Sequence, residues 1–301
     1  MQLAFSTNAF SRHSLPYALQ TIAAAGYTGV EILADKPHWY PHRFHPADVR
    51  RLRRLLERCR LAVSNINANC TFGYWKDAPP EPFFEPSLIS PQARHRQARS
   101  AMIRHTLRFA HALGAENISI TSGKLLPTMP PEKAWRQLLE SLKPLLDLAE
   151  KLQVRIGIEC EPMLFIEWAQ ELRELIDRLG SAMLGANLDL GHSVVLGEDL
   201  EVILQLLRDR IWNCHLEDIA GRKHYHLIPG QGTIDFRHLK SQLDAIAYDR
   251  FLTVELYSHP DRPQTAAEES LRYLRPIFTE SEKPGKQAFG KAERRPAWPL
   301  C

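Results

Sequence analysis

Short apolar runs alternate with longer amphipathic segments along most of the chain. The short runs are rich in β-branched residues and are typical of strands, whereas the longer segments repeat their apolar positions with the period of a helix. We expect strands at 3–7, 29–33, 62–68, 117–121, 155–161, 185–190, 212–217 and 251–256. We expect helices near 16–25, 46–60, 91–113, 131–152, 168–179, 199–209, 236–246 and 264–277.

Residues at the segment ends support several of these helix boundaries. Ser14 and Ser90 each stand shortly before a proline that fits the first turn of a helix. Gly26, Gly114 and Gly180 stand where three helices should stop, because glycine readily adopts the left-handed conformation of a C-cap. These signals predict both where helices begin and where they end.

Eight strand–helix pairs predict one particular α/β architecture. A (β/α)8 TIM barrel contains eight such pairs in about 250 residues. A doubly wound sheet has fewer strands and a glycine-rich turn after the first strand, and residues 6–10, STNAF, form no such motif. We predict a single TIM-barrel domain at 1–278, a long loop over 70–90, and a flexible C-terminal tail at 279–301, where the periodicity is lost.

Composition indicates the setting in which the barrel works. The chain has 301 residues, 44% hydrophobic and 24% charged, as is usual for globular proteins. No apolar run approaches the ~20 residues of a membrane span, and the first residues lack the features of a signal peptide. The five cysteines are an odd number without a CxxC motif, so free thiols are expected. We therefore expect a cytoplasmic protein with no membrane partner.

The charge balance gives little support for a nucleic-acid partner. Lys and Arg number 38 and Asp and Glu 35, a net charge of +3, whereas nucleic-acid-binding proteins usually have a larger or more clustered basic excess. Arginine-rich stretches at 50–54 and 94–108 interleave with apolar residues at helical spacing and fit solvated helix faces. No nucleic acid is expected as a partner, and assembly into a homo-oligomer is left open.

Polar residues stand near the C-terminal ends of the last four expected strands. They are Glu159, Asp189, His215 and Glu255, each between apolar neighbours. This end of a barrel carries the catalytic residues, and the strand period of two directs these side chains into its mouth. Any one of them could be a hydrogen-bonded polar group. Together they favour a divalent cation, such as Mn²⁺, Co²⁺, Mg²⁺ or Zn²⁺, because clustered carboxylates are costly to bury without positive charge.

These residues lie in motifs that resemble those of a known superfamily. The motifs are IECEP with Glu159, ANLDLGHS with Asp189 and His192, NCHLEDI with His215, HYHLIPGQGTIDF, and VELYSH with Glu255. Over residues 1–278 the chain resembles the xylose-isomerase-like TIM barrels, sugar isomerases and epimerases related to endonuclease IV. The resemblance implies one metal ion held by Glu159, Asp189, His215 and Glu255. It also implies that Glu159 and Glu255 are catalytic and exchange protons with substrate carbon through a metal-stabilised enediolate.

Residues around this set are candidates for substrate binding. By resemblance, His192 matches a position that contacts substrate oxygens, and Arg222 or Lys223 matches a substrate-binding arginine. Glu31 and Asn67 end two early strands and Trp75 follows the third, so we expect all three at the mouth. The candidate substrate-binding residues are His192, Arg222, Glu31, Asn67 and Trp75. Glu161 and Glu217 share a face with expected ligands and could support them.

His224 and His226 leave three interpretations open. Two histidines at this spacing can hold a second metal ion, and endonuclease IV has an Asp-x-His pair at the comparable place for a third zinc ion. Here His224 stands in place of the aspartate. The pair could instead contact substrate or lie in a surface loop.

The combined pattern predicts a divalent-metal-dependent isomerase or epimerase acting on a small-molecule sugar or cyclitol. A dehydratase on the same metal site is an alternative. An endonuclease IV-like zinc phosphodiesterase is another, but it needs early histidine ligands where this chain has Glu31 and asparagines. A metabolite-binding protein without turnover has no need of two proton-transfer carboxylates. The substrate's identity and phosphorylation stay open.

Overall fold

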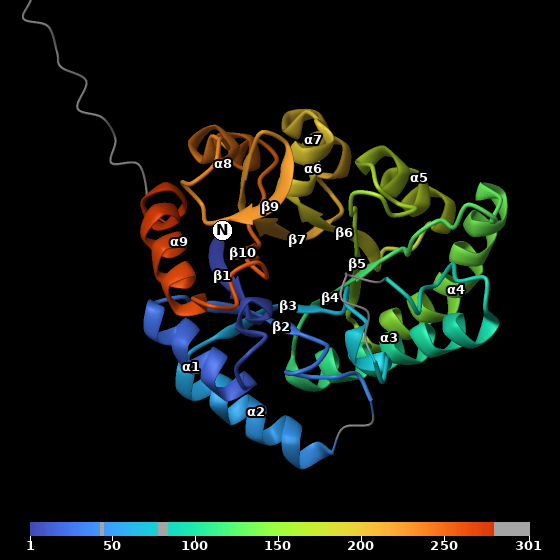
Figure 1. Ribbon diagram of the computed structural model, residues 1–301, viewed down its shortest axis with the longest axis horizontal. Helices are drawn as coiled ribbons and strands as arrows, with labels where there is room; N and C mark the ends of the chain where they lie inside the picture. The colour runs from blue at the N-terminus through green and yellow to red at the C-terminus, as the bar shows by residue number, and fades with distance from the viewer. Residues whose placement is uncertain (43–44, 78–83, 280–301) are drawn as a thin grey trace, which may run out of the picture.

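The computed structural model describes residues 1–42, 45–77 and 84–279. Within them, eight parallel strands close into a barrel in the order β1-β10-β7-β6-β5-β4-β3-β2 (Figure 1). This confirms the predicted TIM barrel. The predicted tail lies outside the described residues from position 280 onward. The barrel strands are β1 Gln2–Ser6, β2 Gly29–Leu33, β3 Ala62–Asn67, β4 Asn117–Thr121, β5 Arg155–Glu159, β6 Leu184–Asp189, β7 Ile211–Leu216 and β10 Phe251–Val254.

Helices surround the barrel and cover its outer face (Figure 1). Their apolar sides pack on the strands, and this outer layer holds most of the buried aliphatic and aromatic side chains. The helices are α1 Leu15–Ala25, α2 Pro46–Cys59, α3 Ala93–Leu113, α4 Pro131–Leu152, α5 Ala169–Leu179, α6 Leu190–Leu196, α7 Leu200–Leu207, α8 Phe236–Ala245 and α9 Pro263–Phe278, with short 3-10 turns at Thr7–Phe10 and Phe72–Tyr74. None of the described helices is long and apolar enough to cross a membrane.

Most predicted helix ends are confirmed, and one is wrong. Ser14 caps α1, and Gly26, Gly114 and Gly180 end their helices with φ of 102°, 78° and 63°. The predicted start at Ser90 is wrong, because α3 begins at Ala93. The Ser90 hydroxyl instead accepts a hydrogen bond from the backbone N–H of Gln92, the residue before α3. A serine hydroxyl can stabilise a turn as well as a helix start, so the sequence signal was ambiguous.

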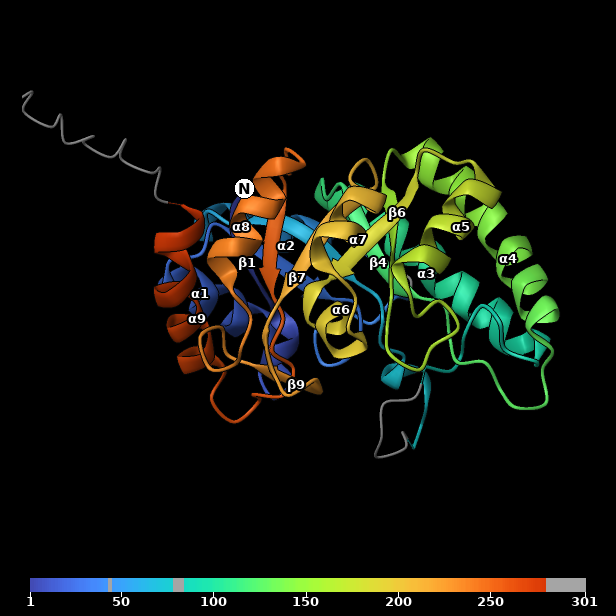
Figure 2. The same cartoon turned by 90° about the horizontal axis from the view of Figure 1, so that it is seen from above.

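The structure adds two elements that the sequence pattern did not predict. The short helix α6 follows β6 at once, because the Asp189 carboxylate caps it by accepting a hydrogen bond from the His192 backbone N–H at 2.8 Å. Strands β8 (Asp218–Ala220) and β9 (Lys223–Leu227) form an antiparallel hairpin outside the barrel. Figure 2 shows β9 at one end of the barrel. The hairpin places His224 and His226, both in β9, at that end of the barrel.

The inside of the barrel is polar rather than aliphatic. Asn117 donates to the Asn65 side chain at 2.8 Å, and Asn213 donates to the Asn187 side chain at 2.8 Å. Thr253 donates to the Asn213 amide oxygen at 2.9 Å. Because these buried groups satisfy one another, the interior can continue as a hydrogen-bonded network up to the charged end of the barrel.

The described cysteines are unpaired, as expected. Cys59, Cys70, Cys160 and Cys214 are all free thiols, and Cys70 lies beside carboxylates of the barrel mouth. The fifth cysteine, Cys301, lies outside the described residues.

Gly185 is required where β6 meets the chain that leads into β7. A Cβ atom there would lie 2.2 Å from the Arg210 carbonyl oxygen and 2.3 Å from Trp212 Nε1. We expect Gly185→Ala to lower the free energy of unfolding by about 1–3 kcal/mol through overpacking, measured by urea denaturation. The control Gln97→Ala, on an exposed face of α3, should change it by less than about 0.5 kcal/mol. Equal stability of the two variants would contradict this account.

Candidate metal centre

Four strand ends bring the predicted ligands together. Glu159 ends β5, Asp189 ends β6, His215 lies in β7 and Glu255 directly follows β10. All four are buried, and one ligand atom of each lies within 4.8 Å of the others. Parallel strands of a closed barrel converge at their C-terminal ends, so residues distant in sequence meet there.

His215 is the centre of this group. Its Nδ1 lies 3.2 Å from a Glu159 oxygen, 3.6 Å from an Asp189 oxygen and 3.6 Å from a Glu255 oxygen. Its Nε2 lies 2.7 Å from Glu31 Oε2 on the other side. Burial disfavours the imidazolium, but Glu31, Glu255 and Glu159 outweigh it and raise the pKa of His215 well above its usual value. The site therefore strongly favours positive charge at its centre.

Asp189 supplies the clearest evidence that these residues fit a cation. Its Oδ1 accepts the hydrogen bond that caps α6, whereas its buried Oδ2 has no hydrogen-bond partner. An unpartnered buried carboxylate oxygen is costly, and a cation would satisfy it. Three carboxylates and one imidazole form the mixed donor set that suits Mn²⁺, Co²⁺ or Zn²⁺.

Amide groups orient the two glutamates. Asn187 donates to Glu159 Oε2, and Asn8 and Asn67 each donate to Glu255 Oε1 at 2.9 Å. The second oxygen of Glu255 is the one that faces His215. Asn8 and Asn187 were not among the predicted site residues, although Asn187 lies two residues before Asp189 and so shares its face of β6.

Three histidines form a second group above the first. Nδ1 of His192 lies 3.0 Å from the Cys160 carbonyl oxygen, and Nδ1 of His226 lies 3.0 Å from the Glu255 carbonyl oxygen. Each Nδ1 therefore donates, which places the lone pair of a neutral ring on Nε2, and the Nε2 of His192 has no hydrogen-bond partner. His224 Nε2 and His226 Nε2 lie 3.0 Å apart, and one nitrogen of each histidine lies within 4.8 Å of the others.

Two further carboxylates border both groups. Glu161 Oε2 lies 3.8 Å from His192 Nε2, and burial is the main cause that raises the pKa of Glu161 to about 7. Both oxygens of the buried Glu217 have no hydrogen-bond partner, and one of them groups with Asp189 and His226. Glu161 and Glu217 thus lie beside the candidate ligands, as expected from their positions on the strands.

The structure does not bring most of the predicted substrate-binding residues to an open position. Glu31 and Asn67 are buried and bond to other site residues, so neither presents a free group to a substrate. The exposed Arg222 guanidinium donates to the carbonyl oxygens of Val195 and Leu196 at the end of α6. A side chain engaged in this way stabilises the helix end, and substrate contact by Arg222 stays a prediction.

Trp75 and His192 lie on different segments of the chain, after β3 and in α6. Trp75 is half-buried, and its indole N–H donates to the Glu85 carbonyl oxygen at 2.7 Å in the segment after β3. His192 lies within the second group. Substrate contact by either residue stays a prediction.

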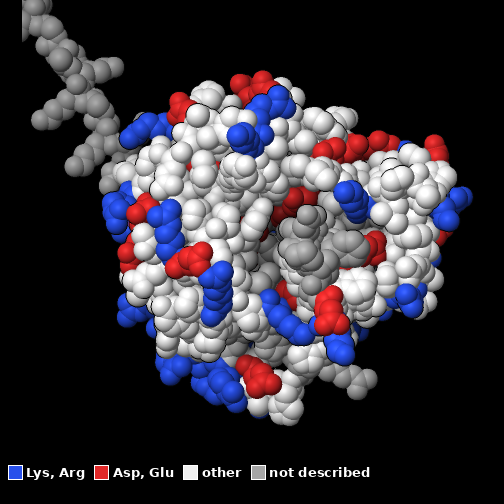
Figure 3. Space-filling model, viewed as in Figure 1, with Lys and Arg blue, Asp and Glu red and all other residues white. Residues whose placement is uncertain are grey.

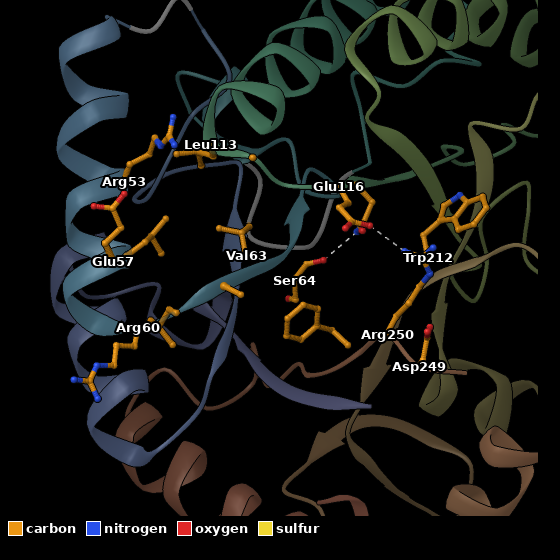
Figure 4. Close-up of a pocket in the computed structure, with 16 residues that line it drawn as sticks. Arg53, Glu57, Arg60, Val63, Ser64, Leu113, Glu116, Trp212, Asp249 and Arg250 are labelled. Carbon is orange, nitrogen blue, oxygen red and sulfur yellow. Dashed lines mark hydrogen bonds and ion pairs between the residues drawn. The ribbon is translucent and has the colours of Figure 1, made fainter. Parts of the chain in front are cut away.

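A separate cavity lies at the opposite end of the barrel. It has a volume of about 760 Å³ and is lined by residues at the starts of β3, β7 and β10, including Ser64, Trp212 and Phe251 (Figure 4). None of the predicted site residues lines it. On the face that carries β9, acidic and basic side chains both lie around the centre (Figure 3).

Comparisons with known proteins agree with this geometry. The family model of the xylose isomerase-like TIM barrel matches residues 19–277. Fructoselysine 3-epimerase of Shigella flexneri is 22% identical over 94% of this chain and 100% of its own length. Inosose dehydratase of Clostridium perfringens is 25% identical over 80% of this chain and 82% of its own. The structure of the IolI protein with a bound zinc atom superposes with a TM-score of 0.74 at 19% identity, covering 92% of this chain and 98% of that one.

Removing the unpartnered oxygen should remove the ion. We expect wild-type protein to retain at least one divalent ion per chain after dialysis, and Asp189→Ala to lose most of it while staying folded, because the lost α6 cap costs only ~1 kcal/mol. Elemental analysis measures the metal and circular dichroism the fold. Asp147→Ala, on an exposed face of α4, is the control. Full occupancy in Asp189→Ala would contradict the assignment.

Proposed function

Because the chain belongs to the xylose isomerase-like TIM barrel family, we propose that it is a divalent-metal-dependent isomerase or epimerase of a sugar or cyclitol. The observation that carries the proposal is the buried group of Glu159, Asp189, His215 and Glu255. Relatives that match over 94% and 80% of the chain are an epimerase and a dehydratase. Both reactions can start from a proton removed next to a carbonyl.

The two glutamates can divide the proton transfer between them. A bound ion would act as a Lewis acid on the substrate carbonyl. Glu159 on β5 and Glu255 after β10 come from separate parts of the barrel wall. One carboxylate removes the proton from carbon, and the other returns a proton, on the opposite face for an epimerisation. Asn187, Asn8 and Asn67 hold the carboxylates in place for this exchange.

The histidine group supports a second candidate function. His192, His224 and His226 would hold an additional ion with Glu161 or Glu217 beside them, and several metal ions suit phosphodiester cleavage. Against it, the early strands contribute Glu31 and asparagines rather than histidines, and His38 lies against the Phe10 carbonyl oxygen. Among the described residues visible in Figure 3, Lys and Arg side chains are scattered over this face and form no continuous patch for a nucleic acid.

Exchange of a carbon-bound proton with D₂O tests the proton transfer. With a suitable ketose or inosose, we expect wild-type protein to exchange the proton next to the carbonyl. Glu159→Gln and Glu255→Gln should each reduce the rate at least ~10²-fold, since glutamine lacks a basic oxygen. Proton NMR measures the exchange, and Glu140→Gln on the exposed face of α4 should match wild type.

Two results would contradict this proposal. One is undiminished exchange in both glutamate variants at equal metal content. The other is metal-dependent incision of an abasic DNA duplex without exchange on any sugar, cyclitol or keto acid.

Metal stoichiometry tests the second candidate. If the histidine group holds an ion, saturating Zn²⁺ should give more than one ion per chain, and the count should fall by one in His224→Ala and in His226→Ala because each variant loses one imidazole of the group. Mass spectrometry under native conditions gives the count. A single ion in wild type, unchanged in both variants, would show that the histidine group holds no metal.

A further inference from the structure

Glu31 is the most enclosed carboxylate next to the metal centre. Its side chain is fully buried and does not line an open cleft. Its Oε2 lies 2.7 Å from His215 Nε2 and accepts a hydrogen bond from Asn65 at 2.7 Å. Its Oε1 accepts a hydrogen bond from Asn67 at 3.1 Å. Both oxygens are thus occupied by protein donors, and no part of Glu31 is left for a substrate.

The contact with His215 decides which ring nitrogen carries the proton. Glu31 is surrounded by donors and acts only as an acceptor, so His215 Nε2 must donate to it. In a neutral ring the lone pair then lies on Nδ1, the nitrogen that faces Glu159, Asp189 and Glu255. A carboxylate behind a metal-binding histidine fixes the ring's orientation and makes it a stronger ligand.

We propose that Glu31 is a positioning residue that holds His215 with Nδ1 directed at the metal ion, rather than a substrate-binding residue. This inference rests on the metal site of the proposed function, but it concerns metal affinity and does not depend on which substrate is used. Glu31 lies 184 residues from His215 in sequence, on β2 near β7 across the barrel interior.

The barrel interior holds Glu31 from behind. The Asn65 amide donates to Glu31 and to Ser119 Oγ, and its oxygen accepts from Asn117 at 2.8 Å. Asn117 in turn lines the cavity at the far end of the barrel shown in Figure 4. A chain of hydrogen bonds thus runs from that end of the barrel to His215, with Glu31 as its last member before the imidazole.

Asn67 couples Glu31 to a second ligand. Its amide nitrogen donates to Glu31 at 3.1 Å and to Glu255 Oε1 at 2.9 Å. A glutamine at position 31 has one oxygen and one NH₂ group. Its single oxygen cannot accept from His215, Asn65 and Asn67 together. Either the glutamine NH₂ group then faces another N–H donor, or His215 Nε2 accepts a hydrogen bond from that NH₂ group. The latter moves the ring proton to Nδ1, where it blocks the lone pair that faces the metal.

The test compares Glu31→Gln with wild type by metal affinity and by the state of the His215 ring. We expect Zn²⁺ and Mn²⁺ affinity, titrated against a competing chelator, to fall about 10–100-fold, as is usual when such a partner of a ligand is removed. Nitrogen NMR of ¹⁵N-histidine-labelled protein should show that His215 loses its fixed Nε2–H form. Ser64→Ala, in the barrel interior but outside the contacts of Glu31, should keep wild-type affinity.

The outcomes separate this inference from the proposed function. Wild-type metal affinity with an unchanged His215 ring in Glu31→Gln would overturn the positioning role, as would a defect confined to substrate KM. Retained metal in Asp189→Ala would instead contradict the assignment of the metal site, on which the proposed function rests. If Glu31→Gln does not fold, Glu31→Asp decides, because aspartate keeps the negative charge but its shorter side chain draws the carboxylate away from His215 Nε2. We expect a loss of metal affinity and of the fixed Nε2–H form of His215, and no change in either would overturn the inference.

Discussion

The dominant constraint on this molecule is the burial of like charges at one end of the barrel. Glu31, Glu159, Asp189 and Glu255 surround the single imidazole of His215, and all of them are removed from water. Carboxylates this close are costly to desolvate unless positive charge and hydrogen-bond donors compensate them. The remaining features of the site are arranged to supply that compensation.

The polar interior of the barrel is one consequence. Branched aliphatic residues usually fill such interiors, but here Asn65, Asn117, Asn187 and Asn213 occupy it and bond to one another. The amides of Asn65 and Asn187 donate to Glu31 and Glu159 above, while the aliphatic core lies outside the strands, against the helices. The outer layer thus stabilises the fold by apolar burial, and the inner layer orients the charged side chains of the site.

The proposed site would suit more than one related reaction. A metal ion and two opposed carboxylates suit any reaction that begins with proton removal next to a carbonyl. The choice between epimerisation, isomerisation and dehydration then depends on what else faces the substrate. In this chain the histidines of the β8–β9 hairpin and α6, with Glu161 and Glu217, are further polar groups beside the four candidate ligands.

The sequence by itself determined the barrel and its four candidate ligands, because strand and helix periods are local and a TIM barrel places strand ends at one face. Glu159, Asp189, His215 and Glu255 were therefore found from their positions alone. Only the tertiary structure decided how Glu31 meets His215, how Asp189 starts α6, and how Arg222 caps that helix. These contacts join residues across the barrel or depend on short loops, and no local pattern specifies which of several polar partners a buried side chain meets.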